Sequence, residues 1–290
     1  MTTATDKTTF YVDSETAPLL DVLVCPPHHY EWLPVNTSAL RTLASGAVLD
    51  RATVVAQHAE LVDALVGAAV RVHEIEPRPE HPYMVYTRDS SHMTPWGPVI
   101  NQMRREPRWG EFYWLKEWYD STGNQPWHYI TRGSVEGGDV SVCQPGLLIV
   151  GASGVRTSET GAEQLCGWFA DQGWNTYVVP FDDHFCHLDL LFDMVAPGLA
   201  LVCEDGLPED FLRFLDTQHI RRIPVSYREA IHVQANVLAI GNDKVISPRA
   251  HTRINEALRA EGLDVLDPDL SELVKGGGSA HCLTQAMRRA

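Results

Sequence analysis

The order of predicted strands and helices repeats along this chain with a period of about 40 to 50 residues. The clearest copy has a strand at 140–143, a second strand at 147–150, a helical stretch and a strand at 176–180. Four further copies begin near residues 20, 83, 187 and 232. Self-similarity at such a period is typical of repeat and propeller architectures. We therefore predict an α/β fold of five strand-strand-helix-strand units instead of a generic mixed α/β domain.

Composition limits the class of protein and of partner. The chain has 290 residues, of which 44% are hydrophobic and 21% charged, so it can bury a large core. We expect a disordered or extended leader at 1–15 and one domain at 16–290. The formal net charge of -15 argues against nucleic-acid and anionic-membrane partners, because both need a positive protein surface. An acidic chain suits a small cationic ligand.

No segment predicts a membrane or secretory location. The apolar runs are shorter than the roughly 20 residues of a membrane helix, and the first residues lack the apolar stretch of a signal peptide. We expect a cytoplasmic protein, with a homodimer as the commonest soluble assembly. The six cysteines lack paired C-x-x-C spacing, which argues against zinc fingers and disulfide frameworks. Cys143, Cys166 and Cys203 are expected in the core.

Acidic and histidine clusters recur where successive units begin. Asp89, Glu136–Asp139 and His187–Asp189 each stand near the start of a predicted strand. The glycine run 276–278 leads into Cys282, and glycine lets the backbone approach a ligand closely. Radial packing of the five units would bring these residues together at the centre.

Cys186 adjoins His187 in this set. We predict a strand over 187–195, and adjacent side chains of a strand point to opposite faces. Only one of the two should therefore reach a pocket. His281 receives no role, and no two candidate ligands have the spacing of a helical metal motif. The sequence predicts neither a metal nor a cofactor.

The ordered set Thr-Arg-Asp, Glu-Gly-Gly-Asp, His-Leu-Asp and Gly-Gly-Gly-Ser-Ala-His-Cys-Leu-Thr resembles the guanidino-group modifying superfamily. Its members include arginine deiminase, dimethylarginine dimethylaminohydrolase, agmatine deiminase, arginine dihydrolase and the arginine amidinotransferases. The resemblance extends from about Leu20 to Cys282. It implies a five-bladed α/β propeller, or pentein, with pseudo-fivefold symmetry and the active site on its axis.

The resemblance also implies the roles of the catalytic residues. Cys282 would attack the guanidinium carbon as a thiolate, and His187 would protonate the departing amine and then activate water. Glu136 resembles the carboxylate that orients this histidine. A peptide amidase of papain type is the simpler alternative. It would need donors for an oxyanion, whereas carboxylates beside a thiol favour a cationic substrate.

Two carboxylates are candidates for holding the guanidinium, whose planar fork they match. Asp89 could alternatively pair with its neighbour Arg88, and Asp189 could stabilise the following hairpin. Dimethylarginine hydrolases tend to have another residue in place of Asp189, so this second carboxylate indicates an unmethylated guanidinium. Asp139 would either contact the substrate or cap the turn that precedes it.

Three further residues are candidates for the other end of the substrate. Arg108 and Arg156 resemble positions that bind the substrate carboxylate, although each could form a surface ion pair, Arg108 with Glu111 for example. Asn36 lies where arginine dihydrolases have a substrate-contacting asparagine, or it is a plain turn residue. Its proline-rich and aromatic loop could act as a lid.

The preferred interpretation is hydrolysis of a C–N bond in arginine or an arginine-like guanidine. Amidino transfer to an amine is the first alternative, because the same thiol and histidine would serve it. A non-catalytic binding protein on the same propeller, like the ribosome anti-association factor, is the second.

Overall fold

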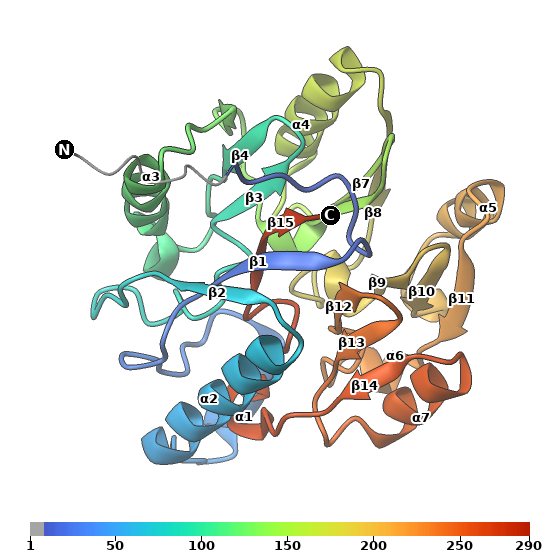
Figure 1. Cartoon of the computed structure of the whole chain (residues 1–290). Helices are drawn as coiled ribbons and strands as arrows, with labels where there is room; N and C mark the ends of the chain where they lie inside the picture. The colour runs from blue at the N-terminus through green and yellow to red at the C-terminus, as the bar shows by residue number, and fades with distance from the viewer. Residues whose placement is uncertain (1–8) are drawn as a thin grey trace.

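The computed structural model describes residues 9–290 and forms five three-stranded sheets from them (Figure 1). In each sheet the first strand is antiparallel to the second, and the second is parallel to the third. The sheets are β15 (Gln285–Arg289), β1 (Leu19–Val24) and β2 (Arg71–Glu74); β3 (Ser91–Thr94), β4 (Gly97–Ile100) and β5 (His128–Tyr129); β6 (Val140–Gln144), β7 (Leu147–Ala152) and β8 (Asn175–Pro180); β9 (Phe192–Ala196), β10 (Leu199–Val202) and β11 (Arg221–Pro224); and β12 (Leu238–Gly241), β13 (Lys244–Ile246) and β14 (Asp264–Leu266). The fivefold repetition of units is confirmed.

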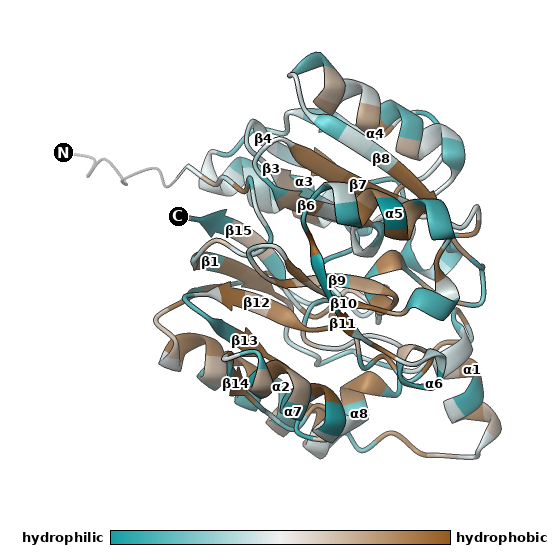
Figure 2. Cartoon of the chain, turned by 90° about the vertical axis from the view of Figure 1, so that its right-hand side faces the viewer, coloured by the Kyte–Doolittle hydropathy of each residue, from teal (hydrophilic) through white to brown (hydrophobic). Residues whose placement is uncertain are grey.

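Helices join the second strand of each sheet to the third, because a parallel pair needs a crossover connection. These helices are α2 (Arg51–Gly67), α3 (Glu111–Thr122), α4 (Glu159–Asp171), α5 (Glu209–Thr217) and α7 (Thr252–Ala260). Shorter helices, α1 (Thr37–Ala44), α6 (Tyr227–Ala230) and α8 (Ser271–Val274), lie in the connecting segments. Figure 2 shows hydrophobic residues, in brown, concentrated on strands such as β7 and β12, while hydrophilic residues, in teal, lie on the helices. Each helix thus buries one face against its sheet.

The sheet around β1 has a strand that the sequence did not predict. β15, near the C-terminus, pairs antiparallel with β1, and Val22 lies opposite Ala286. Its sequence, Gln-Ala-Met-Arg-Arg, has no apolar alternation, which is why the pattern missed it. The two arginines are accommodated because Arg288 pairs with Asp21 and Arg289 donates to backbone carbonyls.

The strand predicted at 187–195 begins later than expected, at Phe192. Residues Leu188–Leu190 form a single 3-10 turn instead. The Asp139 carboxylate accepts a hydrogen bond from the Leu188 amide at 2.8 Å, which takes this amide away from any ladder partner. This turn changes where the side chains before β9 point, because they no longer alternate as in a strand.

The N-terminal segment packs onto the fold from residue 9 onward. Phe10 is buried and stacks on Trp118, and Tyr11 donates its amide to the carbonyl of Met287. Glu15 is buried as well. The rest of the predicted leader, 1–8, lies outside the described residues.

Three cysteines lie in the core as predicted, namely Cys143, Cys166 and Cys203. Within residues 9–290, none of the helices has the length and apolar character needed to cross a bilayer.

Candidate active site

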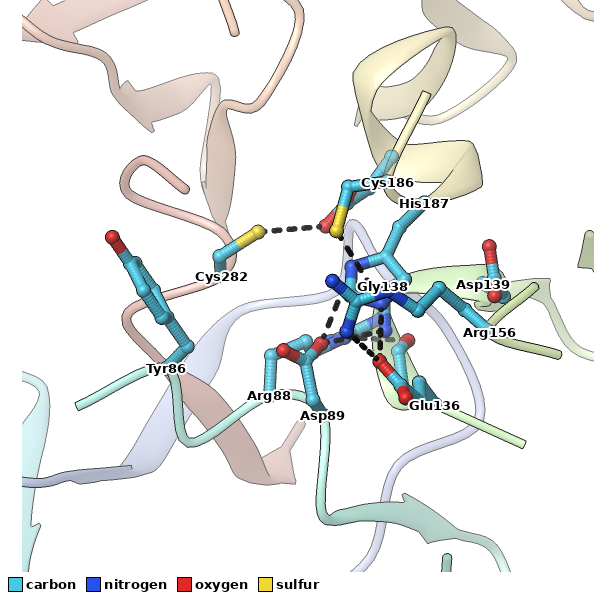
Figure 3. Close-up of polar contacts among 12 residues, drawn as sticks. Tyr86, Arg88, Asp89, Glu136, Gly138, Asp139, Arg156, Cys186, His187 and Cys282 are labelled. Atoms are coloured by element: carbon cyan, nitrogen blue, oxygen red, sulfur yellow. Dashed lines mark hydrogen bonds and ion pairs between the residues drawn. The ribbon is translucent and has the colours of Figure 1, made fainter. Parts of the chain in front are cut away.

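Every unit contributes polar side chains from the residues that precede its first strand, and Figure 3 shows Asp89, Glu136, Asp139, His187 and Cys282 among them. These are Asp89 before β3, Glu136 and Asp139 before β6, His187 and Asp189 before β9, Asn236 before β12, and Cys282 before β15. Because the five positions are equivalent in the repeat, they converge at one place. The prediction that the clusters meet is confirmed.

A cavity lies beside the thiol of Cys282. The predicted residues that line it are Asn36, Asp89, Arg108, Arg156, His187 and Cys282. Glu136, Asp139 and Asp189 do not line this cavity. Glu136 contacts His187 and Asp189 contacts Cys282, both of which line it, whereas Asp139 contacts the amide of Leu188. An outer cavity shares Cys186 and Gly277 with the first and reaches the exposed His184. The two cavities are therefore neighbours, with Cys186 and Gly277 between them.

The thiol of Cys282 is held by two side chains. Its sulfur donates to Asp189 Oδ2 at 3.3 Å and accepts from Asn236 Nδ2 at 3.2 Å. Asn236 Oδ1 also accepts from the backbone amides of Cys282 and Ser279, at 3.1 and 2.9 Å. Asn236 therefore fixes both the loop and the sulfur. The sequence prediction missed it, although its position just before the first strand of the fifth unit was a usable signal.

The electrostatic surroundings disfavour a thiolate in the ligand-free site. Burial and the neighbouring Asp189 carboxylate raise the pKa of Cys282 well above its usual range. Contact with His187 opposes this effect, and the Cys282 sulfur, an imidazole nitrogen of His187 and a carboxylate oxygen of Asp189 lie within 4.8 Å of one another. A positive charge brought to the sulfur would therefore favour the thiolate.

The imidazole of His187 lies between two carboxylates. Its Nε2 is 2.8 Å from Glu136 Oε2, and its Nδ1 is 3.6 Å from Asp89 Oδ1. Burial lowers the pKa of His187, but Cys186 and Asp89 raise it more, so the net pKa lies well above its usual value. A Cβ atom at Gly138 would lie 2.6 Å from His187 Nδ1, so the ring needs glycine there.

Glu136 is ionised although it is fully buried. Burial raises its pKa, but Arg156 and His187 outweigh this and hold the pKa of Glu136 far below its usual range. Arg156 Nη1 donates to Oε2 at 3.0 Å, and the Arg104 amide donates to Oε1 at 3.0 Å. These contacts fix the carboxylate that accepts from His187, as the predicted orienting role requires.

Asp89 pairs with Arg108 and not with its neighbour Arg88. Arg88 instead contacts Glu15 at 2.5 Å. Asp89 Oδ1 accepts from the Gly138 amide at 3.2 Å. The alternative in which Asp89 pairs with Arg88 is therefore wrong.

Arg108 does pair with Glu111, but inside the protein and not on its surface. Its Nε and Nη2 donate to the two carboxylate oxygens of Glu111, both at 2.8 Å, and Nη2 also donates to the Tyr86 carbonyl at 3.1 Å. Arg108 and Glu111 are 2% and 0% exposed. With Asp89 as a further partner, few of its donors are left for a ligand.

The two remaining aspartates have different surroundings. Asp189 Oδ2 contacts the thiol and His281 Nδ1, while its Oδ1 has no hydrogen-bond partner among residues 9–290. Asp139 accepts from the Leu188 amide, and burial raises its pKa to about 7. Asp139 thereby fixes the turn that presents His187 and Asp189.

Arg156 and Asn36 connect the cavity to the loop at 26–36. Arg156 Nη2 donates to the Val35 carbonyl at 2.6 Å. Asn36 caps α1 by accepting from the Ala39 amide at 2.8 Å, and its Nδ2 donates to the Gly276 carbonyl at 2.8 Å. Asn36 is therefore a helix cap and a tie to the glycine run, and it also lines the cavity.

Cys186 and His187 both line the cavity, so the prediction that only one would reach a pocket is wrong. The prediction assumed a strand, whereas Cys186 ends a turn and His187 precedes the 3-10 turn. The Cys186 sulfur lies 4.0 Å from His187 Nε2. A second thiol therefore faces the site.

Two groups have a spacing that a metal ion could use: His187 with Asp189 and Cys282, and Asp89 with Glu136 and His187. Asp89, Glu136 and Asp189 already pair with the cationic side chains of Arg108, Arg156 and His281. We assign no metal ligand, and the absence of a metal remains a prediction.

Comparisons with known proteins agree with the superfamily that the ordered motifs indicated. The family described as N,N dimethylarginine dimethylhydrolase, eukaryotic, matches residues 41–289. The chain is thus a member of the guanidino-group modifying superfamily, and within it the chain belongs to this dimethylarginine dimethylhydrolase family.

Three relatives show how far the likeness extends. The uncharacterized protein YkgA of Bacillus subtilis is 28% identical over 279 residues, which are 95% of this chain and 94% of that protein. The bifunctional arginine dihydrolase/ornithine cyclodeaminase AgrE of Nostoc sp. is 25% identical, and the match covers 90% of this chain but 37% of that protein's length. The N-terminal domain of ArgZ, a cyanobacterial arginine dihydrolase solved with bound substrate, has a TM-score of 0.80 at 22% identity, covering 93% of this chain and 98% of that one. The structural likeness shows a shared fold.

Proposed function

We propose that this protein is a hydrolase that cleaves a guanidino C–N bond of arginine or an arginine-like guanidine through a covalent intermediate on Cys282. The observation that carries the proposal is the convergence of Cys282, His187 and three carboxylates, Asp89, Glu136 and Asp189, at one buried place. A thiol surrounded by carboxylates suits an electrophile that is itself a cation.

The first step is attack of the sulfur on the guanidinium carbon. The bound cation offsets the negative charge of Asp189 and so lowers the pKa of Cys282, which burial and this carboxylate otherwise raise. Asp189 Oδ1, which has no partner among the described residues, is available to accept a guanidinium N–H. Asp89 faces the same cavity and would hold a second nitrogen.

The second step is release of the amine and attack by water. His187 is a cation because its pKa is raised, so it can protonate the departing nitrogen. The resulting neutral imidazole then takes a proton from water as the water attacks the thiouronium carbon, and the C–S bond of this adduct breaks to release the thiolate of Cys282. Glu136 keeps the ring oriented through both transfers at 2.8 Å. The products are ammonia or an amine and a ureido compound, and a second round on that compound would give ornithine.

Arg156 is the better candidate for a substrate carboxylate. Arg108 already donates to Glu111, Asp89 and a carbonyl, whereas Arg156 donates to Glu136 and the Val35 carbonyl. Asn36 lines the same cavity. The ligand would then be an amino acid with a guanidino side chain, bound without a cofactor.

We also infer that the five sheets close into a five-bladed propeller within a single domain over 16–290. Contacts join β15 to β3, β6 to β9, β9 to β12 and β12 to β1. The remaining pair of neighbours, the units of β3 and β6, is linked by a hydrogen bond of 2.9 Å from the amide of Gly137 to the Asp89 carbonyl. The pairing of β15 with β1 brings both ends of the chain into one blade, which supports closure.

The test is incubation with arginine, agmatine or dimethylarginine, with and without an acceptor amine such as glycine, beside a Cys282→Ala control. We expect ammonia or an amine and a ureido product or ornithine without the acceptor. A new guanidino compound formed only with the acceptor would indicate an amidinotransferase. No product from any guanidine would indicate a binding protein and refute the proposal.

A further inference from the structure

The histidine that precedes the nucleophile is part of a buried chain of charges. His281 is 4% exposed, and its Nδ1 lies 2.9 Å from Asp189 Oδ2. The same oxygen accepts from the Cys282 sulfur at 3.3 Å. A single carboxylate oxygen therefore joins the sulfur to the imidazole, although the reaction proposed above gives His281 no task.

Titratable groups from four segments face His281. His281 Nε2 is 3.7 Å from Glu15 Oε2 in the N-terminal segment and 3.9 Å from Asp193 Oδ1 on β9. Asp189 approaches the other ring nitrogen, and Arg88, just before β3, pairs with Glu15 and is the nearby cation that disfavours a charged ring. Three carboxyl groups thus outnumber one guanidinium around this histidine.

We propose that His281, supported by Glu15, is a positioning residue for Cys282: its imidazolium holds Asp189 beside the sulfur and offsets the negative charge that Asp189 places there. A bare carboxylate at 3.3 Å would strongly oppose a thiolate in a buried site. A carboxylate already paired with a cation opposes it less. The ion pair of His281 and Asp189 thus allows a guanidinium-binding carboxylate and a nucleophilic sulfur to lie in the same site.

The protonation states support this role. Burial and Arg88 lower the pKa of His281, but Asp193, Asp189 and Glu15 outweigh them and raise it to about 9. Burial raises the pKa of Asp189, whereas His281 and His187 lower it below its usual value. Burial raises the pKa of Asp193 to about 8, so at neutral pH this carboxyl is protonated, and Asp189 and Glu15 are the carboxylates that face His281. The sulfur then faces an ion pair formed by His281 and Asp189.

The inference rests on the proposed function in taking Cys282 as the nucleophile, but its test needs no guanidine. The rate at which iodoacetamide, a neutral reagent, modifies Cys282 would be measured across a pH series by peptide mass spectrometry, which separates Cys282 from the other five cysteines. Alkylation requires the thiolate, so the rate follows the thiolate fraction.

Three variants give the sign of the effect. His281→Gln should slow alkylation at neutral pH by about tenfold or more, since loss of a nearby cation raises a thiol pKa by about one unit or more. Asp189→Asn should accelerate it, because the carboxylate that opposes the thiolate is removed. Glu15→Gln should slow it less than His281→Gln does, because it acts through the imidazole.

His92→Gln is the matched control. His92 lies on β3, is as buried as His281 and is hydrogen-bonded to Asn101, but burial lowers its pKa to about 3, so it is neutral. Its replacement removes a buried ring without removing a charge, and the alkylation rate should stay within about twofold of the wild type. Melting temperatures check that each variant is folded.

A rate in His281→Gln equal to that of the wild type would overturn the proposal. So would slower alkylation in both His281→Gln and Asp189→Asn, since a structural role alone would move both in the same direction. If His281→Gln fails to fold, an unchanged rate in Glu15→Gln refutes the proposal instead. Failure of every guanidine to react would refute the hydrolase and leave the alkylation result standing.

Discussion

A methyl group added at Gly138 should disable the site while leaving the fold in place. The Cβ of Gly138→Ala would lie 2.6 Å from His187 Nδ1, whereas ordinary contact begins at 3.4 Å. The ring must therefore move by about 0.8 Å (3.4 - 2.6). Such a shift can lengthen the bond from His187 to Glu136, now 2.8 Å, to about 3.6 Å, which is no longer a hydrogen bond.

Two magnitudes follow from this displacement. A misplacement of about 1 Å in a catalytic group costs on the order of a hundredfold in rate, so kcat for the guanidine substrate should fall by about that factor. Overpacking of a buried position costs about 1–3 kcal/mol, so the free energy of unfolding in urea should fall by that amount.

The matched control is Gly167→Ala. Gly167 lies inside α4, is exposed, and an added Cβ would meet nothing within 4 Å. This change should leave kcat unchanged and stabilise the protein by about 0.5–1 kcal/mol, because alanine is the better helix former. Wild-type kcat and stability in Gly138→Ala would refute the claim that this backbone position sets the place of the imidazole.

Three further predictions concern single side chains. Cys282→Ala should abolish turnover and keep arginine binding, measured by calorimetry, within about tenfold; an adduct found by mass spectrometry on Cys186 during wild-type turnover would contradict this assignment. Asn236→Leu leaves the amides of Ser279 and Cys282 without an acceptor, so the free energy of unfolding in urea should fall by about 1–3 kcal/mol for each of them. An unchanged midpoint of the urea unfolding curve would contradict this prediction. Burial raises the pKa of Asp139 from 3.8 to about 7, so the folded chain binds more protons than the unfolded chain in that window and stability falls as pH rises through it. The free energy of unfolding of Asp139→Asn, relative to that of the wild type, should rise by up to about 4 kcal/mol between about pH 4 and about pH 8. If the difference between the two proteins stays constant over this pH range, Asp139 does not titrate in this way.

The sequence predicted the units well where their signals are local. The turn at Gly146 and the apolar runs of β6 and β7 gave the hairpin within about two residues, because period-two burial is a property of neighbouring residues. β15 was missed since its burial depends on a distant partner, β1, and on ion pairs of its arginines. The predicted strand at 187–195 failed for a similar reason: the carboxylate of Asp139 captures the Leu188 amide.

The site shows the same division. Cys282, His187, Glu136 and Asp89 could be selected because chemically distinctive residues recur at one position of the repeat. Asn236 occupied that position too, but an asparagine before a strand carries no chemistry until its amide is seen on the sulfur.

The sequence by itself determined the number of units, and it selected the residues proposed to carry the chemistry, since periodicity and residue type are written along the chain. Only the tertiary structure decided which charges meet. Arg108 serves Glu111 and Asp89, and Glu15 from the N-terminal segment stands beside His281 at the C-terminal end. The pair of Glu15 and His281 joins segments far apart in the sequence, and the strength of all these pairs depends on burial and distance, which no local pattern encodes.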